Sequence, residues 1–426
     1  MKTTGKKILI SIVGDPSSYK EATYHYDRET KSDNFSSSIL IDVEKSDKKI
    51  LIGQYTLAEK GESFEELQRD SLRKISSNIS TASSYDEKII SPGVFYSRKK
   101  NGDLLNFKGE IYDFYAYTLY KLARIFESIN DDVAVILDLT HGINYMGYLT
   151  LSAVNLILSV YSLSKKVKMT VVNSDPYPSG FNNPSNPNLK PDLNINTVLK
   201  REIKPSFLYP ASSEKPLKPY VGEENLNVNK KNLGMELNKD LKDKMECVSN
   251  GKYFVNSINT GALLSSFRFA DNFQDCVNFV VDYFIRNVRT SRENISFNVI
   301  PAFSFTQGFE TLVVAEMIEK IVSINNEVEV GIDELEKRAK IYEDTVMNEI
   351  VQNEIKGVKD LLECQGDWIS LTELMCRKGR NFSKDPDRRT FIAHAGLPVA
   401  FVEINCKEKK LRYKSDVVDK IKNLLS

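Results

Sequence analysis

Short apolar runs alternate with longer segments of helical periodicity over the first half of the chain. The runs are almost free of polar residues, as is typical of strands buried on both faces, and they span residues 7–13, 50–55, 133–137 and 167–172. The segments between them repeat apolar side chains at helical spacing, and they span 34–43, 64–79, 111–129 and about 145–162. Strands that alternate with helices predict a doubly wound α/β domain with a parallel sheet.

Polar, proline-rich sequence interrupts this alternation between about residues 177 and 219. Residues 221–250 are rich in Lys, Asn and Glu and predict a helical connector. Beyond residue 255 the periodicity is helical, except for a β-hairpin expected at 400–405 and 409–413. We therefore predict three parts: a Rossmann-like α/β domain at 1–204, a connector at 205–255, and an α-helical domain carrying a small β-hairpin at 256–426.

The segment that begins at Asp385 holds one of only three histidines in the 426 residues. Its ends have the signals of helix boundaries. Asp385 suits the N-cap, Pro386 suits the first turn, and Gly396 suits a left-handed stop. We predict a helix that carries Arg389 and His394.

Arg389 and His394 are suited to RNA cleavage. RNA is cut when its 2′-OH attacks the adjacent phosphorus, histidine transfers protons near neutral pH, and the arginine fork fits phosphate oxygens. At about 100° per residue, five residues place the two side chains about 140° apart on a helix. They are poorly placed to pair, so the pattern predicts half a site that the same helix of a second chain completes. A local basic cluster suited to a phosphate track lies beside them at Arg377, Lys378, Arg380, Lys384 and Arg388.

Composition narrows the classes of function. Lys and Arg together number 58, as do Asp and Glu, so the net charge is zero and a constitutive nucleic-acid binder is not indicated. Five scattered cysteines fit a reducing cytosol better than a disulfide framework. No CxxC or HExxH motif occurs, no apolar run approaches the roughly 20 residues of a membrane span, and the N-terminus lacks a signal-peptide pattern. We expect a cytoplasmic protein with no membrane contact, no cofactor and no metal among its site residues.

Two predicted strands end in loops rich in small and polar groups. One is Gly-Asp-Pro-Ser-Ser at 14–18, and the other is Thr-His-Gly-Ile-Asn at 140–144. Because ligands bind beyond the carboxyl ends of the strands of an open parallel sheet, both loops are candidates for phosphate or nucleotide binding. Neither is a Walker A motif or a GxGxxG motif. Ordinary strand-to-helix turns, with His141 buried and satisfied, are the alternative interpretation.

Together the two loops resemble the CARF domain, the Rossmann-like sensor of type III CRISPR accessory ribonucleases, over about residues 6–200. Arg-Thr-Phe-Ile-Ala-His-Ala-Gly-Leu at 389–397 resembles the HEPN ribonuclease motif of the same family, although Thr390 stands where a residue such as Asn is usual. The resemblance implies that two CARF domains form one pocket for a cyclic oligoadenylate, with cyclic tetra-adenylate favoured. It places near that ligand Ser11, Gly14, Asp15, Pro16, Ser17, Thr140, His141, Gly142 and Asn144.

The resemblance therefore implies a homodimeric endoribonuclease, or a higher oligomer, that needs no metal and uses Arg389 and His394 as its catalytic pair. Its activator would be made by a type III CRISPR complex, and it would cleave single-stranded RNA in antiviral defence. Three alternatives stay open. A CARF-containing transcription regulator requires a compact basic winged helix, for which only residues 221–250 have room. A ring nuclease would cleave its own activator, with His141 as a candidate residue. A catalytically silent paralogue is the third.

Overall fold

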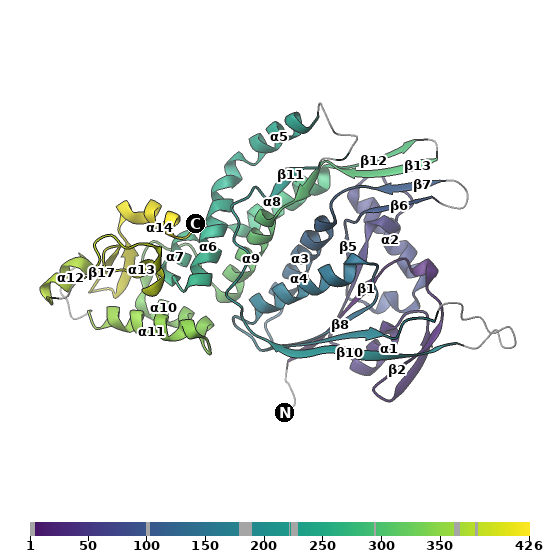
Figure 1. The fold of residues 1–426 in the computed structure, drawn as a ribbon, viewed down its shortest axis with the longest axis horizontal. Coiled ribbons are helices and arrows are strands. Elements are labelled where there is room, and N and C mark those ends of the chain that lie inside the picture. Colours follow the sequence, from purple (N-terminus) through teal and green to yellow (C-terminus); the bar gives the residue numbers. More distant parts are fainter. Residues whose placement is uncertain are drawn as a thin grey trace. The chain divides into compact units, whose positions relative to one another are not determined.

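The computed structural model describes residues 5–98, 103–178, 190–220, 222, 229–293, 295–361, 367–379 and 382–426 (Figure 1). The chain forms two compact units. The first comprises Met1–Lys204, Leu217–Leu237 and Val281–Phe305, and the second comprises Pro205–Pro216, Asn238–Val280 and Thr306–Ser426. These units differ from the predicted boundaries. The predicted connector is divided between them, and residues 281–305, predicted to belong to the C-terminal domain, pack within the first unit.

The first unit is built on an eight-stranded sheet with the order β3-β2-β10-β9-β8-β1-β4-β5. Five neighbouring strands, from β9 to β5 in this order, are parallel, as predicted. The sheet is nevertheless mixed, because β10 runs antiparallel to β9 and β3 antiparallel to β2. The strands are β1 (Lys6–Val13), β2 (Ala22–Tyr26), β3 (Glu29–Asp33), β4 (Lys48–Gln54), β5 (Glu87–Ser91), β8 (Val133–His141), β9 (Val167–Ser174) and β10 (Asp192–Ile203).

The crossover helices of this unit lie where helical periodicity predicts them. They are α1 (Ser37–Glu44), α2 (Phe64–Asn78), α3 (Ile111–Glu127) and α4 (Tyr145–Tyr161). Local capping sets two of their starts. The Ser63 hydroxyl accepts the Glu66 N–H at the start of α2, and Glu110 and Asp113 form a capping box at the start of α3.

A second sheet in the first unit, with the order β12-β13-β7-β6, was not predicted. Its strands are β6 (Phe95–Arg98), β7 (Leu104–Phe107), β12 (Val288–Glu293) and β13 (Ser296–Pro301). Two hairpins far apart in sequence lie side by side because β7 and β13 pair in parallel (Figure 1). A two-stranded ribbon of β11 (Leu217–Pro219) and β14 (Phe303–Phe305) completes the unit.

The C-terminal half of the chain is mostly helical, as predicted. Its helices are α5 (Asn229–Asp240), α6 (Met245–Thr260), α7 (Leu263–Phe269), α8 (Phe273–Arg286), α9 (Gln307–Val322), α10 (Ile332–Ala339), α11 (Val346–Lys359), α12 (Leu371–Arg377), α13 (Arg388–Ala393) and α14 (Val418–Leu424). The predicted hairpin is confirmed as β17 (Val402–Asn405) and β18 (Lys410–Tyr413), and β15 (Val330–Gly331) and β16 (Trp368–Ser370) extend it to four strands.

One expectation from cysteine spacing was wrong. Cys247 on α6 and Cys276 on α8 form a disulfide, although their scattered positions favoured free thiols. Two helices packed in the same unit bring these residues together across 29 positions of sequence. Within the described ranges, no helix is both long enough and apolar enough to cross a membrane.

Candidate functional site

Strands β1 and β8 bring the two predicted loops together. Val13 pairs with His141 in register, and the Gly14 N–H donates to the carbonyl oxygen of His141 at 2.8 Å. A Cβ on Gly14 would lie 2.7 Å from Cγ2 of Ile143, so this approach requires glycine. β1 has β8 on one side and β4 on the other, so the loops lie where the order of parallel strands reverses. That position is the usual ligand crevice of an open α/β sheet.

The His141 side chain packs into an aromatic cluster. Its ring centroid lies 4.3 Å from that of Tyr19 and 5.0 Å from that of Phe35. Its Nε2 accepts the Ser36 N–H at 3.0 Å. Burial lowers the pKa of His141 to about 4, against the smaller opposing effect of nearby carboxylates such as Asp138. The imidazole is therefore neutral at pH 7 with Nε2 engaged, which makes it a poor base for cleaving a bound ring.

Asp138 connects the end of β8 to the start of α1. Its side chain is only 1% exposed, and its carboxylate accepts the hydroxyls of Ser36 and Ser37 at 2.8 and 2.5 Å. It also accepts the N–H and the hydroxyl of Thr140 at 2.9 and 2.5 Å. The sequence showed Asp138 only as the start of the loop motif, not as a site residue. Its carboxylate therefore links the start of α1 to the first residue of the 140–144 loop.

Three of the predicted activator contacts lie below the surface. Ser11, Gly14 and Pro16 are all buried. The Ser11 hydroxyl accepts a hydrogen bond from the Tyr85 hydroxyl at 2.9 Å. The Ser11 hydroxyl is therefore engaged within the unit, and the Pro16 side chain has no polar group to offer a ligand.

Five other predicted residues reach the surface of the loops. The exposed or half-exposed members are Asp15, Ser17, Thr140, Gly142 and Asn144. Asp15 accepts the N–H and the hydroxyl of Ser17 at 3.1 and 2.7 Å, and Lys74 lies 3.5 Å away. Partial burial raises the pKa of Asp15, but these contacts outweigh it and lower the pKa. Asn144, at a φ of 27°, makes no capping bond to α4, which leaves its amide available.

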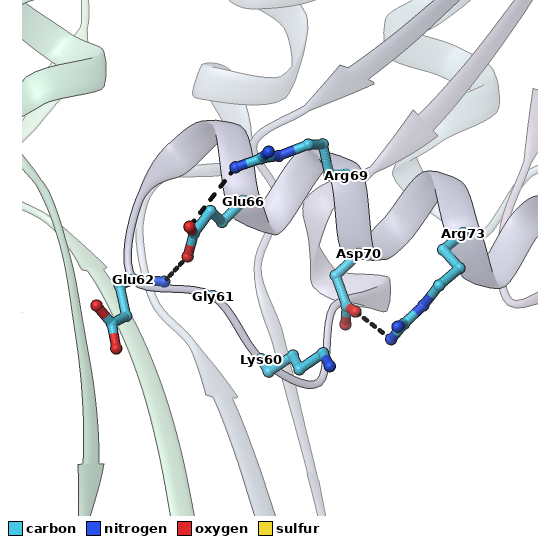
Figure 2. Close-up of a pocket in the computed structure, with 7 residues that line it drawn as sticks. All are labelled: Lys60, Gly61, Glu62, Glu66, Arg69, Asp70 and Arg73. Atoms are coloured by element: carbon cyan, nitrogen blue, oxygen red, sulfur yellow. Dashed lines mark hydrogen bonds and ion pairs between the residues drawn. The ribbon is translucent and has the colours of Figure 1, made fainter.

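A separate cavity of about 520 Å³ lies at the start of α2 (Figure 2). It is lined by Lys60, Gly61, Glu62, Glu66, Arg69, Asp70 and Arg73. Its charges balance and largely pair with one another, since Arg73 lies 2.5 Å from Asp70 and Arg69 lies 3.5 Å from Glu66 (Figure 2). It contains none of the predicted residues and offers no excess charge for a polyanion.

The helix that carries Arg389 is shorter than predicted. It spans Arg388–Ala393, and its N-cap is Asp387, whose carboxylate accepts the Thr390 N–H at 2.8 Å. The prediction of Asp385 as N-cap was wrong, because that carboxylate forms an ion pair with Lys420. His394 is consequently the C-cap of α13 and not part of a regular last turn.

Arg389 and His394 differ in their surroundings. The exposed Arg389 side chain makes no hydrogen bond or ion pair within the described part of the chain. The His394 side chain is 47% exposed, and its Nδ1 lies 3.2 Å from Oε2 of Glu354 on α11. A carboxylate at Nδ1 fixes the orientation of an imidazole and leaves Nε2 for proton transfer. Sequence reasoning missed Glu354, because 40 positions separate it from His394 and no local motif joins them.

A hydrogen bond from a buried tyrosine of the second unit holds the backbone after His394. The Tyr413 hydroxyl on β18 donates to the Gly396 carbonyl at 2.6 Å and is 2.7 Å from the Ser265 hydroxyl. Gly396 has the predicted left-handed conformation, with a φ of 74°. A Cβ there would lie 2.6 Å from Cβ of Ala262, so close packing as well as conformation requires glycine. The His394 segment is therefore a fixed part of the unit.

Comparison with known proteins identifies both units. A family model described as "CRISPR system endoribonuclease Csx1, CARF domain" matches residues 8–176, and one described as its HEPN domain matches residues 344–416. The CRISPR system endoribonuclease Csx1 of Methanocaldococcus jannaschii is 27% identical over 423 residues, which cover 94% of this chain and 86% of that protein. The chain belongs to the CARF–HEPN family.

The predicted fold class is confirmed by these matches. The CARF domain is the mixed α/β unit and includes both loops, and the HEPN domain is helical with a small sheet. The matched HEPN segment contains Arg389, His394, Glu354 and Tyr413, whereas Ala262 and Ser265, which pack behind the His394 segment, lie outside it. The homologous endoribonuclease supports a CRISPR-associated ribonuclease.

The basic cluster of the HEPN domain is largely engaged. Its described members are Arg377, Lys378, Lys384 and Arg388, and Arg380 lies outside the described residues. Arg377, Lys378 and Arg388 already donate to oxygen atoms of this chain at 2.6–3.1 Å. The cluster offers less free charge to a phosphate track than its sequence indicates.

The connector does not provide the winged helix that a transcription regulator requires. A winged helix includes a β-hairpin, whereas the structure forms α5, a short 3-10 turn and the start of α6 between residues 229 and 255. That alternative has no support from the described connector.

Proposed function

We propose that this chain is a metal-independent endoribonuclease that cleaves single-stranded RNA and is activated by a cyclic oligoadenylate, with cyclic tetra-adenylate favoured. The observation that carries the proposal is the imidazole of His394, oriented by Glu354, on the same short segment as the exposed Arg389, which makes no hydrogen bond or ion pair with the described residues. These residues lie in or beside α13, within the segment that the HEPN family model matches. The name of the homologous Csx1, an endoribonuclease, supports the same activity.

The reaction needs only proton transfer and charge stabilisation. The 2′-oxygen bonds to phosphorus as its proton passes to a base, and the bond from phosphorus to the 5′-oxygen breaks as an acid protonates that oxygen. His394 is suited to carry these protons through Nε2, while the Glu354 carboxylate stabilises the imidazolium that forms. Arg389 would bind the non-bridging phosphate oxygens, which gain charge in the transition state.

A second copy of the chain would complete the site. Arg389 lies in the first turn of α13 and His394 is its C-cap, so one copy presents the two residues from opposite ends of the helix. On α11, Val346 is 88% exposed and lies two turns before Glu354, and Ile350 is 44% exposed and lies one turn before it, on the same face. These exposed apolar residues, on the helix whose Glu354 contacts His394, support a homodimer. When Arg389→Ala and His394→Ala chains are mixed, we expect partial recovery of activity if the site is shared, and no recovery if each chain holds a complete site.

The activator would bind across the two CARF loops of a dimer, since a two-fold pocket suits a two-fold symmetric ring. Ser17, Asn144 and the backbone around Gly142 are neutral groups suited to phosphates. Asp15 carries a negative charge and suits ribose hydroxyls. The source would be the cyclic oligoadenylate made by a type III CRISPR complex, and the role would be antiviral defence in the cytoplasm.

Labelled single-stranded RNA, incubated with the protein in EDTA with and without cyclic tetra-adenylate, tests the proposal. We expect cleavage only with the activator and none by the His394→Ala chain. Activity that disappears in EDTA would contradict metal independence. Equal activity without any cyclic oligoadenylate would contradict activation.

A further inference from the structure

The sheet β12-β13-β7-β6 of the first unit presents one polar row across its four strands. Tyr96 pairs with Asn106, Asn106 with Asn298, and Asn298 with Ser291. Directly paired residues project from the same face of a sheet, so these four side chains stand side by side. Two hairpins, which lie next to each other in Figure 1, build the row from parts of the sequence 192 positions apart.

The opposite face of this sheet is already packed. Phe107, Phe297 and Val299 are at most 5% exposed, and the Phe107 ring lies 5.6 Å from that of Tyr55 in the body of the unit. The polar row therefore lies on the outer face. Tyr96 is 69% exposed there, which is unusual for a large aromatic side chain.

Hydrogen bonds fix the orientation of the row. Asn106 Nδ2 donates to Asn298 Oδ1 at 3.0 Å, and Asn298 Nδ2 donates to the Ser291 hydroxyl at 3.4 Å. This arrangement leaves one further N–H on each amide and the Oδ1 of Asn106 for another molecule. The row thus offers a fixed array of donors and acceptors next to an exposed aromatic ring.

The outer face also has an excess of positive charge. Arg98 lies two residues beyond Tyr96 on β6, and Arg289 lies two residues before Ser291 on β12, so alternation places both on this face. Both are exposed and have no ion pair or hydrogen bond among the described residues. Glu293 is the acidic residue that β12 adds to the same face. This local excess contrasts with a chain whose net charge is zero.

We propose that this outer face, on the unit that does not carry Arg389 and His394, binds single-stranded RNA. Tyr96 stacks on a base, the amide row bonds to base edges, and Arg98 and Arg289 contact phosphates, as in other sheet platforms for single strands. A second copy of the chain suits the face less well, because the amide row occupies its centre and the half-buried Leu104 and Ile300 lie on either side of that row. The identity of the ligand rests on the proposed ribonuclease function, and the face would raise the affinity for long substrates.

Fluorescence anisotropy tests this face without cleavage, using the full chain with His394→Ala and labelled single-stranded RNA of about 16 nucleotides, near the upper site size of one binding domain. We expect Tyr96→Ala to weaken binding about five- to 150-fold, the range for one stacked base. Arg98→Glu should also weaken binding and flatten its salt dependence. The matched control is Arg28→Glu, which makes the same charge change at the exposed turn between β2 and β3 and should leave the affinity unchanged.

Tyr96→Ala and Arg98→Glu chains that bind this RNA as tightly as the parent would overturn the proposal. A changed oligomeric state of these variants, measured by light scattering, would also overturn it, because it would assign the face to contacts between copies. With cyclic tetra-adenylate present, cleavage of an RNA of about four nucleotides, too short to occupy a second binding site at the same time, should be the same for Tyr96→Ala and parent chains with His394 intact. A parent that cleaves neither this RNA nor the RNA of about 16 nucleotides with the activator present would refute the ribonuclease proposal and leave the anisotropy result interpretable.

Discussion

His141 of the CARF domain and His394 of the HEPN domain have opposite surroundings. His141 is enclosed by Tyr19 and Phe35, and its Nε2 accepts a backbone N–H. His394 is half-exposed, and a carboxylate holds its Nδ1. In the sequence each histidine follows a short apolar segment, so sequence position alone does not distinguish the role of His141 from that of His394. The first imidazole has the bonding of a structural residue, and the second has that of a proton carrier.

The groups that contact each imidazole ring therefore determine its role more than the surrounding sequence motif does. A neutral, enclosed imidazole stiffens the loop that would contact the activator. The half-exposed imidazole of His394, held at Nδ1 by Glu354, keeps its Nε2 directed away from that contact and available to a substrate. The predictions below test this division of roles, beginning with the largest expected effect.

Removal of the proton carrier should have the largest effect. We expect His394→Ala to lower activator-dependent RNA cleavage by about 10²- to 10⁴-fold, the usual contribution of general acid–base catalysis. His25→Ala is the matched control, because His25 is a partly exposed residue of β2 that contacts Asp192. Cleavage rates measured by gel electrophoresis decide the point. A rate that survives in the His394→Ala chain would assign the chemistry elsewhere.

His141 should make stability depend on pH. Its folded pKa of about 4 lies below the ordinary value of 6.5, so between these values the unfolded chain binds more protons and stability falls as the pH falls. At 1.36 kcal/mol per pKa unit, the full loss is roughly 3 kcal/mol. Urea unfolding between pH 7 and 4 measures it. His141→Gln should show a flatter dependence, and equal slopes in the two chains would contradict the buried, neutral imidazole.

Loss of the carboxylate at His394 should lower catalysis without removing it. We expect Glu354→Gln to reduce kcat about 10- to 100-fold, as for other carboxylates that orient a functional histidine, with KM nearly unchanged. Steady-state kinetics on a short RNA give both values. Glu349→Gln, on the same helix and exposed, is the matched control. Equal kcat values for the two variants would remove Glu354 from the site.

The smallest effect should come from removing the hydrogen bond that Tyr413 donates to the backbone after His394. Tyr413→Phe leaves the Gly396 carbonyl without its donor, which should cost about 1–3 kcal/mol of stability and little of the cleavage rate. Thermal unfolding compares it with Tyr253→Phe, whose ring packs on Phe269. Equal melting temperatures would show that the Tyr413 hydroxyl does not secure the segment.

Local patterns predicted the features that depend on local sequence. The apolar runs located the central parallel strands and their helices, because burial on both faces leaves a clear signature in each segment. The motif that contains Arg389 and His394 was also found, because its residues are contiguous in the sequence. Its helix start was misplaced by two residues, because Asp385 and Asp387 both suit an N-cap and only the structure shows that Asp387 accepts the Thr390 N–H.

Features that depend on distant pairing could not be predicted. The sheet that carries Tyr96 and Asn298 joins two hairpins whose strands are only four to six residues long, and the pairing between the hairpins is not written in either segment. The contact between Glu354 and His394 likewise arises only when α11 and α13 pack in the same domain. The enclosure of His141 depends on Tyr19 and Phe35, which approach it only in the folded sheet.

Titration of cyclic tetra-adenylate into the full chain carrying His394→Ala, followed by calorimetry, tests the separation of sensing from cleavage most directly. If the CARF loops bind the activator and His394 serves only the cleavage reaction, the variant should bind as tightly as the parent, with one ring for two chains, and cleave no RNA. Absent binding, or one ring for each chain, would contradict a shared two-fold pocket that acts apart from the cleavage site.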